Sequence, residues 1–103
     1  MKKKIENIVR HSDWSEKEIE RYLVEKVRSL GGICLKYSNQ NMTGYPDRII
    51  MLPLGKTAWA ELKSKGKKPT LLQTIRHESL RELGQIVEVL SSKEEVDDFL
   101  KKL

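Results

Sequence analysis

The chain has 103 residues, of which 20 are Lys or Arg and 15 are Asp or Glu, so its formal net charge is +5. This length allows one domain with a single small core, and the basic balance is compatible with nucleic acid or an anionic membrane surface. The lone cysteine, Cys34, excludes an intrachain disulfide and a multi-cysteine zinc site, and no apolar run approaches the roughly 20 residues that span a bilayer.

Residues 1–14 are predicted to form a basic N-terminal arm, and residues 15–103 a single domain. The arm carries three early lysines without a following apolar stretch, which does not match a secretory signal. A solvated tail and an arm that touches DNA phosphates both fit this composition. We expect a cytoplasmic protein.

The capping-box pattern at Ser15 and Glu18 predicts a helix that ends near Leu30, before two glycines. Glu20 is in phase with the apolar residues of this helix and therefore projects from its core-facing side. An acid in that position needs a partner, because an unpaired buried carboxylate is costly. A metal ion and a salt bridge satisfy this need equally well.

Three β-rich segments follow, at residues 32–37, 48–52 and 57–63. A turn signal between the second and third segments predicts a hairpin. Side chains alternate between the two faces of a strand, so Glu61 and Lys63 share one face, while the small residues of the other face suit close packing against a helix. Asp47 opens the second segment and should lie across from Glu61 and Lys63.

A second capping box, at Thr70 and Gln73, predicts a helix that ends at Gly84. A strand over residues 85–90 and a helix that begins after Ser92 complete the chain. The element order α-β-β-β-α-β-α predicts an α/β fold with a small mixed sheet flanked by helices.

Two carboxylates and a lysine at one end of a hairpin suit metal-assisted chemistry on a phosphate. The oxygens of Asp47 and Glu61, with the backbone carbonyl of Leu62, match the hard oxygen ligands that Mg²⁺ prefers. Lys63 would hold or activate a water molecule and offset charge that develops on the phosphate. Each residue also has a structural interpretation when it is considered alone. Asp47 can be an ordinary turn aspartate, and Glu61 and Lys63 can form an exposed cross-strand charge pair.

These residues resemble the VRR-NUC (virus-type replication-repair nuclease) branch of the PD-(D/E)XK nuclease superfamily. The matching features are Gly44-Tyr45-Pro46-Asp47-Arg48, Glu61-Leu62-Lys63, the lysine- and glycine-rich loop after it, and Gln73. The resemblance covers roughly residues 15–100. It implies a restriction-endonuclease-like α-β-β-β-α-β core with an additional C-terminal helix.

The resemblance also implies roles for single residues. Asp47, Glu61 and Glu20 would bind Mg²⁺ or Mn²⁺, and Lys63 would be the catalytic lysine. Gln73 matches the family's glutamine at the start of the following helix, although its capping role alone also explains it. The implied activity is a structure-selective DNA endonuclease that acts as a homodimer in replication or repair.

Two active sites related by a twofold axis suit a symmetric substrate such as a four-way (Holliday) junction. Cleavage of flaps or nicked duplexes is the main alternative within the enzyme interpretation. A non-catalytic basic DNA-binding module and a protein-interaction domain are the alternatives outside it.

The positive charge is concentrated beside the predicted site. From residue 63 to residue 81, six Lys or Arg stand against one Glu, which gives a local net charge of +5. Lys65, Lys67 and Lys68 are therefore expected to contact DNA phosphates. Arg76 contacts DNA or pairs internally, and Tyr45 packs on a sugar or base or at the edge of the core. His11 and His77 match no metal or catalytic spacing and are given no catalytic role.

Overall fold

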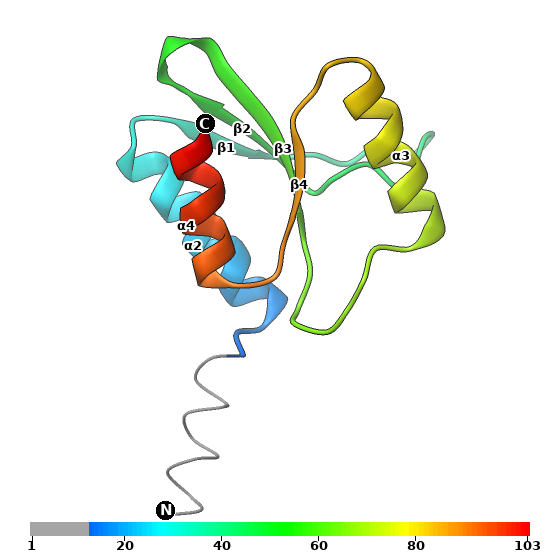
Figure 1. The fold of residues 1–103 in the computed structure, drawn as a ribbon, viewed down its shortest axis with the longest axis horizontal. Coiled ribbons are helices and arrows are strands. Elements are labelled where there is room, and N and C mark those ends of the chain that lie inside the picture. Colours follow the sequence, from blue (N-terminus) through cyan, green and yellow to red (C-terminus); the bar gives the residue numbers. More distant parts are fainter. Residues whose placement is uncertain (1–12) are drawn as a thin grey trace, which may run out of the picture.

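The computed structural model describes residues 13–103. It contains, in chain order, α2 (Glu16–Ser29), β1 (Ile33–Lys36), β2 (Arg48–Leu52), the 3₁₀ turn η1 (Pro53–Gly55), β3 (Lys56–Leu62), α3 (Leu71–Glu82), β4 (Val87–Leu90) and α4 (Lys93–Lys102). Every predicted helix and strand is present, and the α-β-β-β-α-β core with a C-terminal helix is confirmed (Figure 1).

Both predicted capping boxes form. Ser15 Oγ accepts a hydrogen bond from the Glu18 N–H, and the Glu18 carboxylate accepts one from the Ser15 N–H. Thr70 and Gln73 exchange the same pair of bonds at the start of α3. These reciprocal bonds satisfy backbone donors that a helix start otherwise leaves free, which fixes where α2 and α3 begin.

The strands form one mixed sheet in the order β1-β2-β3-β4. The β1–β2 and β2–β3 pairs are antiparallel, whereas β3 and β4 run parallel. In the β2–β3 hairpin Arg48 lies opposite Ala60 and Ile50 opposite Ala58. The connecting turn is tight enough to force Leu54 to a φ of 67°, and this leucine is 95% exposed.

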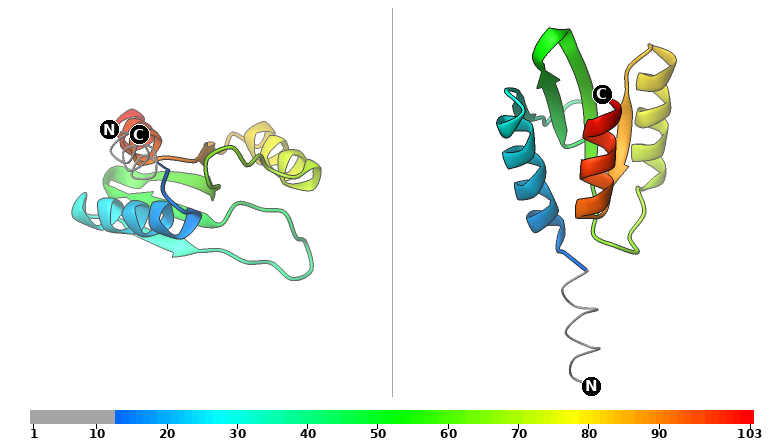
Figure 2. Two further views of the ribbon diagram at one scale, coloured as in Figure 1. Left: turned by 90° about the horizontal axis from the view of Figure 1, so that it is seen from below. Right: turned by 60° about the vertical axis from the view of Figure 1, so that its left-hand side comes forward.

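Helices cover the two faces of the sheet unequally. α2 and α4 lie on one side of the sheet, and α3 lies on the other (Figures 1 and 2). The core lies under α2 and α4 and is made of Ile19, Leu23, Val27, Ile50, Ala58, Ala60, Leu62, Leu90, Val96, Phe99 and Leu100. The small-residue face of β3 therefore packs against helices as predicted, and the alternate side chains of β3 are left for the other face.

The packed part of the chain begins slightly earlier than predicted. Trp14 was assigned to the basic arm, but it packs against the core, and its ring makes an edge-on contact with Tyr22 at 5.5 Å. The rest of the arm, His11 included, lies outside the described residues. Within residues 13–103 no helix is long and apolar enough to cross a membrane.

Candidate active site

Asp47 and Glu61 meet where β2 begins and β3 ends. The Leu62 N–H donates a hydrogen bond to Asp47 Oδ2 at 3.0 Å, so the carboxylate of Asp47 is attached to the end of β3. On its other side, the Asp47 backbone carbonyl accepts a hydrogen bond from the Tyr37 N–H at 2.8 Å. The predicted placement of Asp47 across from the Glu61–Lys63 segment is confirmed.

Glu61 is buried, with 1% of its surface exposed. Lys63 Nζ lies 3.8 Å from Glu61 Oε2, and the Lys63 side chain is 16% exposed. Glu61 Oε1 has no hydrogen-bond partner. The interpretation of Glu61 and Lys63 as an exposed charge pair is therefore wrong, because β3 turns this pair toward α3 rather than toward solvent.

The surroundings of Glu61 favour its neutral form. Burial, the negative charge of Asp47 and a hydrogen bond with Asp47 raise the pKa of Glu61 to about 8, while Lys63 acts in the opposite direction. Two carboxyl groups this close cannot both ionise at low cost unless positive charge joins them. The pair is therefore suited to receiving a cation.

His77 faces the same carboxyl group from α3. Its Nε2 lies 3.5 Å from Glu61 Oε1, and the imidazole is 2% exposed. Burial, together with the positive charges of Arg81 and Lys63, lowers the pKa of His77. The ring is therefore neutral at physiological pH, and its contact with Glu61 is not an ion pair.

No sequence pattern assigns His77 a catalytic role, but the structure brings it to the site. The available signal was its spacing from Gln73, because residues four apart lie on the same face of a helix. A single histidine without a metal-ligand spacing was too weak a pattern to use.

Gln73 caps α3 as predicted and also contacts Glu61, while its role in catalysis stays a prediction. Its Nε2 donates to Glu61 Oε2 at 3.4 Å, and its Oε1 accepts the Thr70 N–H at 2.9 Å. The start of α3 is thus held against Glu61 by the same side chain that caps the helix. This arrangement couples the position of α3 to the orientation of the carboxyl group.

Glu20 lies in an ion pair with Arg48 and does not join Asp47 and Glu61. Arg48 Nε donates to Glu20 Oε2 at 2.9 Å, and Arg48 Nη1 donates to the Cys34 carbonyl at 3.1 Å. Both Glu20 and Arg48 project from the face that carries α2, so the salt bridge weighed for Glu20 is the observed outcome. Its role as a metal ligand stays a prediction that this geometry does not support.

Glu16, one turn earlier on α2, has only a small electrostatic effect on the site. Its charge contributes to the raised pKa of Glu61. Glu16 belongs to the first turn of α2 and is exposed.

A divalent cation would therefore be held mainly by Asp47 and Glu61. Within residues 13–103 no three His, Cys, Asp or Glu side chains are grouped closely enough to hold a metal by themselves. Mg²⁺ characteristically takes one or two carboxylates and completes its shell with water and substrate phosphate. The unpartnered Oε1 of Glu61 and the mutual repulsion of the two acids fit such an ion, and the Leu62 carbonyl would be a further ligand.

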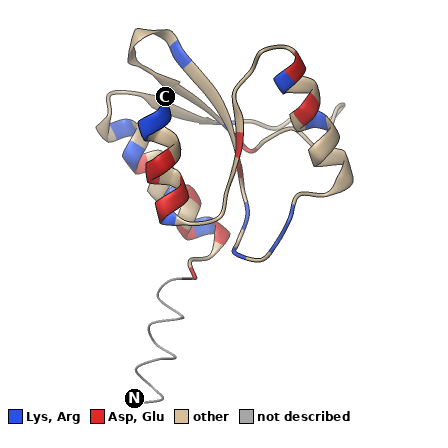
Figure 3. Ribbon diagram, in the orientation of Figure 1, with Lys and Arg blue, Asp and Glu red and all other residues tan. Residues whose placement is uncertain are grey.

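The predicted DNA-contacting residues divide into two groups. Lys65, Lys67 and Lys68 are exposed on the loop between β3 and α3, where Lys65 Nζ lies 3.2 Å from Asp13 Oδ1 (Figure 3). Arg76 and Tyr45 also make contacts within the protein. Arg76 Nε donates to the Thr43 carbonyl at 2.9 Å, and its guanidinium carbon lies 5.2 Å from the centre of the Tyr45 ring.

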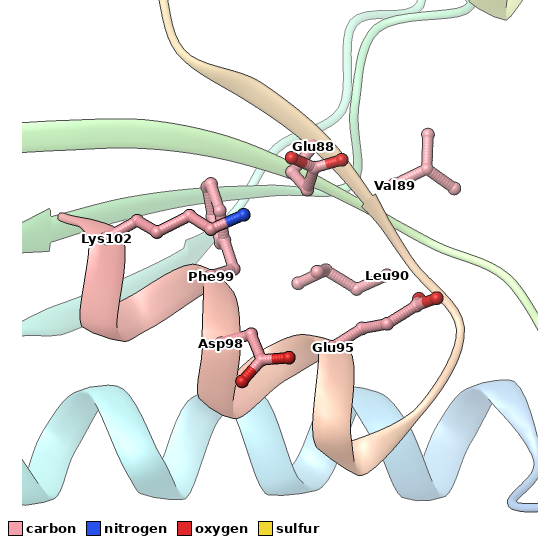
Figure 4. A pocket seen from close by; sticks show the side chains of 7 residues that line it. All are labelled: Glu88, Val89, Leu90, Glu95, Asp98, Phe99 and Lys102. Atoms are coloured by element: carbon pink, nitrogen blue, oxygen red, sulfur yellow. The ribbon is translucent and has the colours of Figure 1, made fainter.

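A second concave region lies between β4 and α4, away from this site. Figure 4 shows the carboxylates of Glu88, Glu95 and Asp98 around it, with Lys102 from the end of α4. Glu95 is already used, because its Oε1 accepts the Ser91 N–H at the start of α4. The region lacks the orphaned buried groups that mark Glu61 and His77, and we assign it no chemistry.

Comparisons with known proteins show what the chain as a whole is similar to. No family model matches the sequence. The phage protein "Putative nuclease p44", from Acyrthosiphon pisum secondary endosymbiont phage 1, is 43% identical over 79 residues, which cover 77% of this chain and 85% of that protein. A solved structure described as "VRR_NUC domain" matches with a TM-score of 0.79 at 30% identity, over 85% of this chain and 97% of its own.

Proposed function

This chain is a nuclease that belongs to the VRR-NUC family, and we propose that it is a metal-dependent endonuclease for branched DNA such as four-way junctions. The observation that carries the metal dependence is the buried carboxyl group of Glu61. It lies beside Asp47, and its Oε1 has no hydrogen-bond partner. The reaction is the hydrolysis of a phosphodiester bond. The proposed location is the cytoplasm, that of the host cell for a phage enzyme.

Each residue of the site has a distinct task in this proposal. When bound, Mg²⁺ or Mn²⁺ polarises the phosphoryl group and makes the attacking water easier to deprotonate. Asp47 and Glu61 hold the cation. Lys63 Nζ lies 3.8 Å from Glu61 Oε2, and its side chain remains 16% exposed, so its ammonium can orient the water and offset negative charge on the phosphate. Gln73 keeps Glu61 in place through its hydrogen bond to Oε2.

A non-catalytic DNA-binding module explains the site less well. Such a module needs exposed cations for phosphates and has no use for a buried acid. Burying Glu61 against Asp47 destabilises the fold, and this cost is understandable if the carboxyl binds a cation. The same argument counts against a protein-interaction domain.

A second copy of the chain is proposed as the partner. The sheet face opposite α2 and α4 is only partly covered, and Ile33, Leu35 and Met51 expose 59%, 44% and 42% of their surface there. Light scattering should give the mass of a dimer for the wild type, and Ile33→Glu should shift it to a monomer. A monomeric wild type at micromolar concentration would remove the homodimer and the symmetric-junction argument with it.

The function is tested by a cleavage panel of four-way junctions, flaps, nicked duplexes and single strands, each with Mg²⁺, Mn²⁺ or chelator. We expect cutting only with added metal and a preference for branched substrates. Asp47→Ala and Lys63→Ala should abolish cutting. Matched changes outside the site, Asp98→Ala and Lys36→Ala, should retain it, since both residues are exposed.

Two results would contradict the proposal. Undiminished cutting by Asp47→Ala or Lys63→Ala would show that the site is misassigned. Salt-sensitive DNA binding that a chelator does not change, with no product under any metal, would favour the non-catalytic module.

A further inference from the structure

A hollow of about 250 Å³ opens beside Asp47 and Gln73, and no residue of the cationic loop lines it. Its walls come from the segment that joins β1 to β2, which supplies Ser38, Asn39 and Met42, with Tyr37 and Tyr45 at the two ends. In Figure 2 (left) this segment leaves the sheet and runs out beneath α3. Nothing in the nuclease mechanism uses this space.

The hollow has a rigid wall. Asn39 Oδ1 accepts the backbone N–H groups of Asn41 and Met42 at 3.0 Å each, and Asn39 Nδ2 donates to the Tyr37 hydroxyl at 3.2 Å. At the far end of the segment, Arg76 of α3 donates to the Thr43 carbonyl. The shape is therefore held by side-chain bonds at both ends, so a ligand would meet it largely formed.

Its chemistry excludes a phosphate. Among the lining side chains the only formal charge is the negative charge of Asp47, and none of them is a Lys or Arg. The lining combines aromatic rings and a thioether with amide and hydroxyl groups, which is the mixture that nucleobases bind in single-stranded nucleic acid. At about 250 Å³ it is smaller than the roughly 300–1,000 Å³ of sites for drug-sized ligands, so it suits one base.

We propose that this hollow receives the base of one unpaired nucleotide next to the phosphodiester bond held at Asp47 and Glu61. The inference rests on the proposed nuclease function and adds a source of substrate selection to it. A base stacked in an intact duplex must be extruded before it can enter, whereas an unpaired base at a branch, flap or end is already free. The site would thus discriminate against intact duplex without reading its sequence.

The experiment combines a change in the protein with a change in the DNA. The incision point of the wild type is mapped first, and single abasic nucleotides are then placed at each position around it. Met42→Trp fills the hollow, and Gln40→Trp is the matched control, because Gln40 is exposed on the same segment but does not line the space. Circular dichroism checks that both variants fold, and Ser38→Phe is the second filling variant.

We expect one abasic position to slow the wild type roughly ten-fold or more, a factor within the range of losing one stacked base. Met42→Trp should slow the complete substrate by a similar factor and leave the abasic substrate unchanged relative to the wild type. Gln40→Trp should behave as the wild type on both. If the wild type cuts every abasic substrate as fast as the complete one, the hollow holds no base, although the nuclease function stands.

A binding measurement separates this inference from the function on which it rests. 2-Aminopurine is placed in turn at each position around the branch point, and at one position its fluorescence should change when the DNA binds Lys63→Ala, whose altered residue does not line the hollow. Met42→Trp in that background should suppress the change. Absence of cutting by the wild type under every metal would overturn the proposed function. In that case the 2-aminopurine signal decides the hollow by itself, and an unchanged signal overturns it.

Discussion

At the scale of single residues, the protonation of Glu61 couples the site to the stability of the fold. Burial and the neighbouring Asp47 disfavour the charged form of Glu61, Lys63 favours it, and the balance leaves the pKa of Glu61 at about 8. The unfolded chain would ionise this group near the ordinary value of 4.5. The folded protein therefore holds a proton that the unfolded protein has released over the whole interval between these values.

Stability of the metal-free protein should consequently fall as the pH rises from 6.5 to 8. Because the pKa of Glu61 is raised on folding, the folded state loses its advantage as the pH approaches 8. The expected loss in unfolding free energy over this window is about 1–2 kcal/mol. Urea titrations in chelator measure it, and Glu61→Gln should remove the slope.

The pH range for this measurement begins at 6.5 because His77 affects stability mainly below that pH. His77 has its pKa lowered on folding, so it destabilises the folded state only as the pH drops below its ordinary value of 6.5. Saturating Mn²⁺ should flatten the wild-type slope above pH 6.5, because a bound cation displaces the proton from Glu61. A wild-type slope equal to that of Glu61→Gln would contradict the raised pKa.

His77 should affect cation binding through the position of Glu61. We expect His77→Ala to weaken Mn²⁺ binding by about 10- to 100-fold in calorimetric titration, because it removes the imidazole that lies 3.5 Å from Glu61 Oε1 and limits where that oxygen can move. His77→Gln, which keeps a polar atom near Oε1, should recover part of the affinity. Leu80→Ala, a buried neighbour on α3, is the control: it should lower stability by about 2–5 kcal/mol without changing Mn²⁺ affinity.

Strand alternation explains why part of this site could be predicted from the sequence. Asp47, Glu61 and Lys63 lie on one hairpin, so period-two geometry and one turn place them together. Glu20 and His77 lie on helices, and helical phase gives only the side that faces the sheet. Whether such a residue meets Arg48 or Glu61 depends on how the helix crosses the strands, which local sequence does not encode.

At the scale of elements, the segment between β1 and β2 is held against α3 at Gly44. Its φ is +96°, and a Cβ built on it would lie 2.9 Å from Leu72 Cγ and 3.1 Å from Arg76 Cγ. These contacts involve atoms near the helix backbone, so they cannot be relieved by moving the tip of a side chain. The close approach keeps Asp47, at the end of the segment, in register with α3.

Gly44→Ala should therefore be more costly than an alanine at a comparable glycine elsewhere. Gly66 is the matched control, with a φ of +86° and no atom within 4 Å of its built Cβ. We expect a loss of about 1 kcal/mol for Gly66→Ala from the left-handed backbone alone, and about 2–3 kcal/mol for Gly44→Ala. Urea unfolding measures both losses. Equal losses would show that α3 shifts to accommodate the added Cβ, so that its contact with Gly44 is not tight.

The boundaries of the elements were predictable to different degrees. Both capping boxes fix helix starts through bonds between residues three apart, so local sequence determines them. The predicted strand at residues 85–90 begins at Val87 instead, because its start depends on pairing with β3, where Trp59 lies opposite Val87. The uncovered half of the sheet could not be predicted, since it depends on where α3 packs.

At the scale of the whole molecule, basic and acidic side chains are distributed unevenly among the elements. The loop between β3 and α3 carries only basic charge, whereas α2 and α4 mix both signs (Figure 3). Residues 63–81 have a local net charge of +5, equal to that of the entire chain. The remainder is balanced, so attraction for a polyanion is concentrated at the loop beside Asp47 and Glu61.

Replacing Lys65, Lys67 and Lys68 together by Gln should reduce the salt dependence of DNA binding. Each lysine that neutralises a phosphate contributes roughly 0.9 to the slope of log affinity against log salt on duplex DNA, so the slope should fall by between about two and three. Fluorescence anisotropy at several salt concentrations measures this slope. The inactive Asp47→Ala background prevents cleavage during the titration.

The matched control removes the same charge elsewhere. Lys56, Lys101 and Lys102 are exposed and lie outside the loop, so replacing all three by Gln lowers the net charge equally. If attraction is local, the control should keep nearly the wild-type slope, because charges beyond a Debye length of about 8–10 Å are largely screened. Equal slopes for the two triple variants would mean that DNA responds to net charge alone, and the loop would lose its role in placing a phosphate at the site.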